Sequence, residues 1–137
     1  MTGTMHHTTE IVVRGYHHDS YGHVNHARFL ELLEEARWRL FEDRIGSGAL
    51  RKDESPVVVV NVNIDYKVPA KLYDTLVIDT GLESIGNTSA VFRQRITIKE
   101  SGAEAVDAKV TFVAVDPKSG KPIPVGGKLR ELLDGLR

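Results

Sequence analysis

The segment of residues 25–43 reads NHARFLELLEEARWRLFED and has the pattern of an amphipathic α-helix. Its apolar residues recur every three or four positions, which places them on one face of a helix. The regular members of this face are Phe29, Leu33, Ala36 and Leu40. Asn25 is a suitable N-cap, because its side chain can accept a hydrogen bond from a first-turn amide. Gly46 and Gly48 are expected to end the helix.

The sequence on both sides of this helix has the signals of β-strands. A first strand is expected at residues 10–16. Beyond a polar loop at residues 51–55, apolar and polar residues alternate in three segments, which predicts antiparallel strands with one buried face. These segments are residues 60–66, 92–99 and 106–114, and a less regular strand is expected at residues 76–82. Turns at residues 86–87 and 101–102 are typical of hairpins, and a short helix is expected at residues 128–136.

The order of these elements indicates the fold class. One long helix followed by a run of antiparallel strands predicts an α+β fold in which the helix covers one face of the sheet. With 137 residues, the chain is expected to form a single domain over residues 1–137. Residues 1–8 are expected to be a loose N-terminal leader.

Composition argues against several classes of protein. The sequence has no cysteine, which excludes disulfides, thiolate metal sites and a cysteine nucleophile, and is compatible with the cytoplasmic location that we expect. The first ten residues lack the apolar core of a secretory signal. The longest apolar run, residues 56–60, is too short to cross a bilayer, so no membrane partner is expected. The 18 basic and 19 acidic residues are interspersed, which argues against a nucleic-acid partner.

The densest group of reactive side chains is YHHDSYGHVNH at residues 16–26, where the first strand gives way to the long helix. First-turn amides of a helix lack intrahelical acceptors, and the helix dipole favours negative charge beside them. Such a position can therefore stabilise an oxyanion. Asp19 lies just upstream of the helix and could act there as a general base or as a nucleophile.

Other interpretations of this segment remain open from the residues alone. Polar clusters before helices are most often loops and caps. Asp19, His23 and His26 could ligate a metal ion, but no known zinc spacing such as HExxH is present. Ser20 lacks the G-x-S-x-G turn that would favour it as a nucleophile. We expect neither a metal nor a cofactor.

Residues 14–31, RGYHHDSYGHVNHARFLE, resemble the signature of the 4-hydroxybenzoyl-CoA thioesterase-like hotdog family. The likeness is closest to its FadM-type branch of long-chain acyl-CoA thioesterases. Residues 58–70, VVVNVNIDYKVPA, and residues 108–116 are similar to the same branch, so the resemblance covers nearly the whole chain. It implies the hotdog fold, a long central helix wrapped by a bent antiparallel β-sheet. It also implies hydrolysis of medium- to long-chain acyl-CoA.

The resemblance assigns roles to particular residues. Asp19 matches the catalytic aspartate, and the backbone N–H of His26 matches the donor that polarises the thioester carbonyl. Many members have asparagine at the position of His26, which should not alter a backbone donor. His23 and Asn25 match motif positions, where orientation of Asp19, water binding or capping are the alternatives. The residues implied in substrate binding are Tyr16, Asn61, Asn63, Tyr66 and Lys67.

The resemblance also implies partners. Members join two sheets edge to edge, with active sites at the subunit boundary, so we expect a homodimer at least, with a homotetramer as the larger alternative. Basic residues should meet the CoA phosphates, and the unranked candidates are Lys67, Lys71, Arg93 and Arg95. Two rival functions remain: a hotdog-fold dehydratase acting on hydroxyacyl thioesters, and a non-catalytic acyl-CoA-binding protein.

Overall fold

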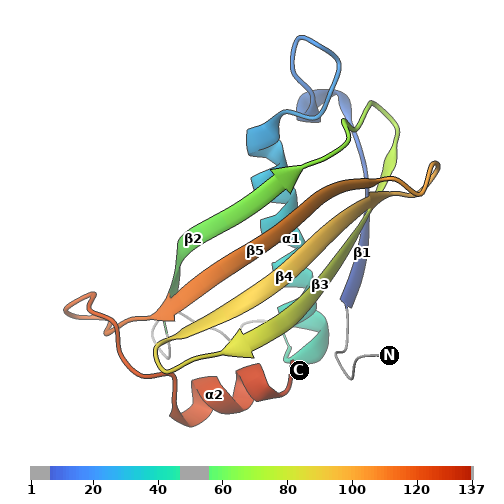
Figure 1. Ribbon diagram of the computed structural model, residues 1–137. Coiled ribbons are helices and arrows are strands. Elements are labelled where there is room, and N and C mark those ends of the chain that lie inside the picture. The colour runs from blue at the N-terminus through green and yellow to red at the C-terminus, as the bar shows by residue number, and fades with distance from the viewer. Residues whose placement is uncertain (1–6, 47–55, 137) are drawn as a thin grey trace.

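The computed structural model describes residues 7–46 and 56–136, which form a five-stranded sheet, a long helix and a short C-terminal helix. The first half contains β1 (His7–Val12), a 3-10 turn (Gly15–His17), α1 (His26–Arg44) and β2 (Val57–Tyr66). The second half contains β3 (Thr75–Ile85), β4 (Ser89–Ile98), β5 (Glu104–Ala114) and α2 (Gly127–Asp134). Every strand pair is antiparallel, in the order β1-β3-β4-β5-β2. Figure 1 shows α1 lying across one face of the bent sheet, which confirms the expected α+β architecture.

The period-two pattern of the central strands explains the core between sheet and helix. Leu76 and Ile78 of β3 lie opposite Ile98 and Ile96 of β4, so all four point to the same face of the sheet. These side chains are at most 5% exposed and pack against the apolar face of α1. That face contributes Phe29, Leu32, Leu33 and Ala36. The core is therefore the interface between the helix stripe and the inner face of the sheet.

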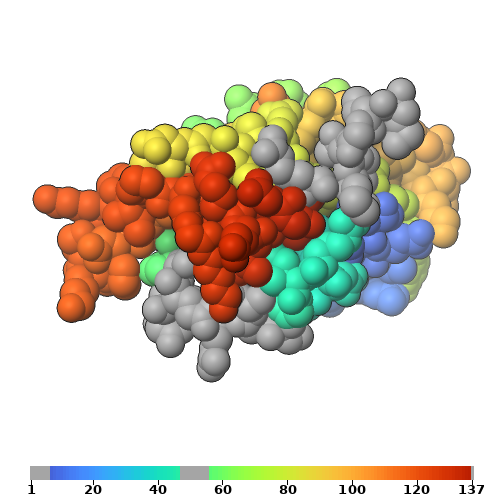
Figure 2. Space-filling view, turned by 90° about the horizontal axis from the view of Figure 1, so that it is seen from below, coloured from blue at the N-terminus to red at the C-terminus, as the bar shows by residue number. Residues whose placement is uncertain are grey.

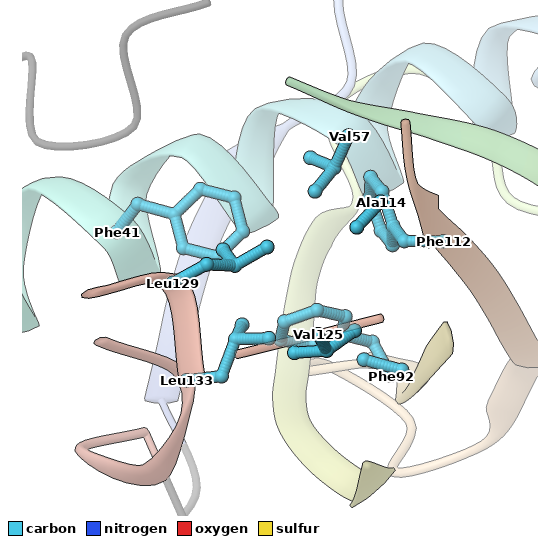
Figure 3. Close-up of a pocket in the computed structure, with 9 residues that line it drawn as sticks. Phe41, Val57, Phe92, Phe112, Ala114, Val125, Leu129 and Leu133 are labelled. Carbon is cyan, nitrogen blue, oxygen red and sulfur yellow. The ribbon is translucent and has the colours of Figure 1, made fainter. Parts of the chain in front are cut away.

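A second apolar cluster fills the space where α2 meets the end of α1. Figure 2 shows α2 beside the C-terminal part of α1. In Figure 3, Leu129 and Leu133 of α2 point toward Phe41 of α1 and toward the sheet. The small pocket among these side chains is lined only by apolar residues. It therefore offers no acid, base or nucleophile, and we regard it as part of the core.

The ends of the helices follow the local sequence signals. The side chain of Asn25 accepts a hydrogen bond from the amide of Ala27 at 2.8 Å, which confirms it as the N-cap of α1. Gly46 follows the helix with φ of 111°, a conformation that glycine adopts at little cost. Gly48 and the expected polar loop lie outside the described residues. The short C-terminal helix is expected at residues 128–136. The observed α2, Gly127–Asp134, begins one residue earlier and ends two residues earlier.

The first strand differs from its expected limits. It runs from His7 to Val12 rather than over residues 10–16, so His7 and Thr8 belong to the sheet and not to a leader. Residues 1–6 of the expected leader lie outside the described part of the chain. The strand ends early because the next residues form a 3-10 turn, in which the amide of His17 donates to the carbonyl of Arg14 at 3.0 Å.

The expectation of a buried face on residues 60–66 is wrong for β2 in the single chain. Val60 is 56% exposed and Val62 37% exposed, and only Val57 and Ile64 are half-buried. β2 is an edge strand that pairs only with β5 among the described strands, and α1 packs mainly on β3 and β1, which leaves Val60 and Val62 exposed in the described part of the chain. A register shift between Val59 and Asn61 also interrupts the alternation at Val60.

Candidate active site

The residues that the sequence places around the start of α1 form an open cleft. Asp19, His23 and His26 line it together with two residues from the end of β2 and beyond, Tyr66 and Lys67. Its apolar wall consists of Val24, Phe29, Val68 and Pro69. The cleft has a volume of about 340 Å³ and lies at the opposite end of α1 from the apolar cluster around α2. The structure thus brings a carboxylate, two imidazoles and a helix N-terminus to one apolar-walled opening.

The loop that carries Asp19 is held by its own backbone. The amide of Asp19 donates to the carbonyl of His23 at 2.8 Å, and the amide of Gly22 donates to the carbonyl of Asp19 at 3.1 Å. Gly22 has φ of 81°, which permits this tight reversal. One carboxylate oxygen of Asp19 accepts from the amide of Tyr21 at 2.8 Å. The other oxygen has no hydrogen-bond partner within residues 7–46 and 56–136, so it is available to a ligand.

His17 anchors this loop to the start of the helix. It is 7% exposed, its Nδ1 accepts from the amide of Arg14 at 2.8 Å, and its carbonyl accepts from the amide of Asn25 at 2.9 Å. Burial, aided by the nearby cations Arg28 and Arg14, lowers the pKa of the imidazole below its usual value. A neutral His17 therefore fixes the geometry between Asp19 and α1, a role that the sequence pattern did not distinguish from the neighbouring histidines.

The first turn of α1 leaves one backbone amide without an acceptor, at a residue that lines the same cleft as Asp19. The carbonyl of Asn25 accepts from the amides of Arg28 and Phe29, and its side chain satisfies the amide of Ala27. The amide of His26 has no acceptor among the residues that the structure describes. An unpaired amide at a helix N-terminus is the arrangement that stabilises developing negative charge.

Tyr66 closes the cleft on the side of β2. Its phenol donates to the carbonyl of His26 at 3.0 Å, and its ring centroid lies 5.8 Å from that of Phe29. Partial burial raises the pKa of this phenol above its usual value, so it stays a neutral donor. Lys67 also lines the cleft, but its ammonium lies 2.6 Å from Glu104, and this bond raises the pKa of the lysine.

Other residues that the resemblance implicated lie elsewhere. Asn25 caps the helix and is not part of the cleft wall. Tyr16 is 72% exposed and packs against His17, with ring centroids 4.2 Å apart. Asn61 and Asn63 lie opposite Thr111 and Lys109, on the sheet face turned away from α1. In the single chain, these four residues do not share the cleft with Asp19.

The sequence pattern did not single out Val68 and Pro69 as parts of the site. They follow Tyr66 and Lys67 directly, so proximity in sequence to the implied binding residues was the available signal. Among the residues that the structure describes, no group of three His, Asp or Glu side chains is placed to hold a metal ion. No helix in the same part of the chain is both long enough and apolar enough to cross a membrane.

Comparisons with known proteins identify the family of this chain. The family model described as the Thioesterase-like superfamily matches residues 13–133. The long-chain acyl-CoA thioesterase FadM of Escherichia coli (strain K12) is 44% identical over 93% of this chain and 97% of its own length. The acyl-CoA thioester hydrolase YbgC of Escherichia coli O6:H1 is 35% identical over 80% of this chain and 84% of its own. The crystal structure of the probable thioesterase YbaW from Escherichia coli matches with a TM-score of 0.84 at 43% identity, covering 94% of this chain and 97% of that chain. This protein belongs to the thioesterase-like superfamily and has its hotdog fold.

Proposed function

We propose that this protein is an acyl-CoA thioesterase that hydrolyses medium- to long-chain fatty acyl-CoA to free fatty acid and CoA. The observation that carries the proposal is the shared cleft, in which a free carboxylate oxygen of Asp19 and the unpaired amide of His26 line one opening. The 44% identity with FadM over nearly the whole of both chains supports the same reaction and the longer acyl groups.

In the proposed reaction, the thioester carbonyl oxygen lies against the amide of His26. The N–H bond and the positive end of the helix dipole then stabilise the charge that develops on this oxygen as the carbonyl carbon is attacked. A backbone donor needs no particular side chain, so His26 can serve where relatives of the family have asparagine. Tyr66 positions this donor, because its phenol is bound to the carbonyl of the same residue.

Asp19 supplies the attack by one of two routes. As a general base, its carboxylate takes a proton from water while the water oxygen bonds to the carbonyl carbon. As a nucleophile, the carboxylate forms a mixed anhydride that water then opens. Both routes release the CoA thiolate and leave a fatty acid. Because thiols have a pKa of about 8.5, the thiolate departs without a strong general acid.

The apolar wall of the cleft supports an acyl substrate. Val24, Phe29, Val68 and Pro69 adjoin the reactive groups and can cover the first methylene groups of an acyl chain. Neither rival function draws support from a particular contact. A non-catalytic binding protein would not require a free carboxylate and an unpaired amide in one cleft. A dehydratase of this fold would pair a histidine with an acid, and among the described residues the imidazoles of His23 and His26 make no hydrogen bond or ion pair with a carboxylate.

The active assembly that we propose is a homodimer joined along β2, which could in turn pair into a homotetramer. β2 is an edge strand, and an exposed edge with uncovered apolar side chains is a site for pairing with another chain. Four of its valines are between 37% and 56% exposed: Val58, Val59, Val60 and Val62. Tyr66 at the end of this strand lines the cleft, so a second copy along β2 would adjoin the active site. A cytoplasmic location remains part of the proposal and rests on the cysteine-free sequence.

A thiol-release assay with a panel of acyl-CoA substrates tests the function. We expect kcat/KM for dodecanoyl- and palmitoyl-CoA to exceed that for acetyl- and benzoyl-CoA. Faster hydrolysis of the short or aromatic thioesters would overturn the substrate class but not the reaction. Absence of thiol release from every thioester, by a folded protein, would overturn the reaction itself.

A further inference from the structure

The four basic residues considered for CoA phosphate binding differ in whether a carboxylate already neutralises them. Three of the four candidates for CoA phosphate binding form ion pairs within the chain. These pairs are Lys67 with Glu104, Arg93 with Asp107, and Arg95 with Glu104. The ammonium of Lys71 has no carboxylate oxygen within 4.0 Å in the described part of the chain. Lys71 is therefore the candidate whose charge is available to an anionic ligand.

Lys71 lies next to the cleft. Its backbone forms an isolated antiparallel bridge with His23, which lines the cleft together with Asp19. The neighbouring amide of Val24 donates to the carbonyl of Ala70 at 2.8 Å, which fixes this contact. The segment that leads to Lys71 also provides Pro69 to the cleft wall. Lys71 therefore follows the cleft wall directly in the chain and is joined by its backbone to a residue of that wall.

Lys71 is the first residue of a tight turn in which Tyr73 has an unfavourable backbone conformation. The amide of Asp74 donates to the carbonyl of Lys71 at 3.0 Å, and a carboxylate oxygen of Asp74 accepts from the amide of Lys71 at 2.9 Å. Tyr73 occupies the third position with φ of 70°, as a type II turn requires. Within the described residues it is the only non-glycine residue with positive φ. Glycine is the residue that this position favours.

The tyrosine side chain gains little from packing in return for this backbone conformation. Tyr73 is 68% exposed, and its ring contacts no other aromatic ring among the described residues. Its amide donates to the carbonyl of Val13 at 3.0 Å, a bond that glycine would make equally well. Residues held in strained conformations at the surface are concentrated at sites of function. The aromatic ring is thus presented to solvent in the same turn as the unpaired cation of Lys71.

The distance from the cleft to this turn suits the substrate. Pro69 and Tyr73 are four residues apart, so their Cα atoms are at most about 14 Å apart. The pantetheine arm of CoA has a backbone of about thirteen bonds, comparable to four residues, and so spans about the same length. A thioester held between Asp19 and His26 would place the phosphates and the purine ring outside the cleft, near this turn.

We propose that Lys71 and Tyr73 form the subsite for the nucleotide end of CoA. The Lys71 ammonium contacts a phosphate group, and the phenol ring of Tyr73 stacks on the adenine base. Base stacking on an exposed aromatic side chain is a general mode of nucleotide recognition. The inference rests on the proposed function, because it takes acyl-CoA as the ligand, and it adds the residues that distinguish CoA from a shorter thioester.

The test compares Tyr73→Gly with the wild-type protein on dodecanoyl-CoA and on dodecanoyl-pantetheine, which lacks the nucleotide. We expect the KM for dodecanoyl-CoA to rise about tenfold, within the range of a lost base stack, with kcat unchanged. The KM for dodecanoyl-pantetheine should not change. Thermal stability should not fall, because glycine suits the turn better than tyrosine. Tyr73→Phe keeps the ring and should keep the wild-type KM for both substrates.

Lys71→Ala tests the phosphate contact separately. The KM for dodecanoyl-CoA should rise about threefold and should depend less on ionic strength, because a charge contact has been removed. Lys121→Ala is the matched control, since Lys121 is an exposed lysine at the opposite end of the sheet, next to the bridge between Val115 and Pro122. Lys121→Ala should leave both the KM for dodecanoyl-CoA and its dependence on ionic strength unchanged.

An equal effect of Tyr73→Gly on the two substrates, or none on either, would overturn the subsite. If the wild-type protein hydrolyses neither thioester, the proposed function fails, and calorimetric titration with CoA decides the subsite instead. Weaker CoA binding by Tyr73→Gly than by the wild-type protein and by Tyr73→Phe would then support it. Equal binding by all three proteins, or no binding by any, would exclude it.

Discussion

The phenol of Tyr66, the last residue of β2, donates a hydrogen bond to the backbone carbonyl of His26, the first residue of α1, at 3.0 Å. The two residues are 40 positions apart in the chain. The bond ties the edge strand of the sheet to the end of α1 where the amide of His26 has no acceptor among the described residues. It therefore links the packing of the fold to the position of the donor that we propose for the oxyanion.

Tyr66→Phe should separate two roles of Tyr66, the hydrogen bond that positions the start of α1 and the packing of its ring against Phe29. The variant keeps the ring contact with Phe29 and loses only the hydrogen bond, which should lower the free energy of unfolding by about 1 kcal/mol. We expect kcat to fall several-fold, because the helix end is less firmly held, while the KM changes little. Steady-state kinetics and urea denaturation measure the two effects. An unchanged kcat would show that the bond does not position the donor.

His17 predicts a pH dependence of stability. Burial lowers its pKa in the folded protein, so between the lowered pKa and the unfolded value of about 6.5 the unfolded chain binds more protons. The stabilisation is therefore complete above about pH 6.5 and is lost as the pH falls toward the lowered pKa. Protonation would also remove the acceptor for the amide of Arg14.

Melting temperatures measured between pH 5 and pH 8 test this dependence. His17→Asn offers a carbonyl oxygen near the position of Nδ1 but has no group that titrates in this range. Its melting temperature should vary less with pH than that of the wild-type protein. Parallel pH profiles of the two proteins would show that His17 does not contribute to the acid sensitivity.

Local sequence signals were sufficient for the helix and for half of the site. The limits of α1 and the cap at Asn25 depend on residues within one or two helical turns, so pattern and capping rules could predict them. Asp19, His23 and His26 are only three or four positions apart in sequence, and the loop that leads to the helix is closed by its own backbone bonds. Their proximity in space therefore follows from their proximity in the chain.

The rest of the site depends on contacts between distant segments. Gln94 lies between Phe92 and Ile96 on the apolar face of the alternating segment 92–99, but the alternation does not show what could satisfy a buried glutamine there. The amide nitrogen of Gln94 donates to the carbonyl of Leu33 and to the hydroxyl of Thr80, which are 61 and 14 residues away, and its Oε1 accepts from Arg37, which is 57 residues away. The exposure of Val60 likewise depends on the position of β2 at the sheet edge, and a strand's place in a sheet is not encoded in its own residues.

The buried pair of Arg37 and Gln94 predicts a large effect on stability. Arg37 is 8% exposed, and its guanidinium donates to Gln94 Oε1 at 2.9 Å. Burial lowers the pKa of Arg37, although an arginine stays charged. Gln94→Leu would leave this cation buried without its acceptor, and we expect a loss of about 3 kcal/mol in the free energy of unfolding.

Adding Arg37→Met to the Gln94→Leu variant tests that cause. The double variant removes both polar groups, so the free energy of unfolding should return to within about 1 kcal/mol of the wild-type value. Chemical denaturation of the four proteins of the cycle gives the coupling energy. A double variant no more stable than Gln94→Leu alone would show that lost packing, and not an unpaired cation, causes the effect.

The proposed dimer predicts that a charge on the β2 edge prevents assembly. Val60 is 56% exposed in the single chain, so Val60→Lys should not disturb the fold of one subunit. Light scattering at micromolar concentration should show a dimer or tetramer for the wild-type protein and a monomer for the variant. Thr8→Lys places the same charge on β1, the opposite edge, and should leave the assembly intact. A wild-type protein that is only monomeric would refute the proposal.

Asp19→Asn tests the centre of the proposed reaction. Asparagine keeps the size of the side chain and an oxygen that can accept from the amide of Tyr21, but it has neither the basic lone pair nor the nucleophilic charge of a carboxylate. We expect kcat to fall by a factor of about a hundred or more, which is the scale of a lost acid–base group. Binding of acyl-CoA should survive, because the cleft wall and the amide of His26 are unchanged.

Two further variants give activity losses with which the effect of Asp19→Asn can be compared. His26→Asn should reduce turnover little, because any residue other than proline presents the same backbone N–H. His23→Ala should have an intermediate effect if its imidazole orients Asp19 or a water molecule. Thermal stability must be measured beside the thioesterase rate for each variant, because a loss of activity that follows unfolding would say nothing about chemistry. A stably folded Asp19→Asn protein with near-normal turnover would show that the carboxylate is neither the base nor the nucleophile.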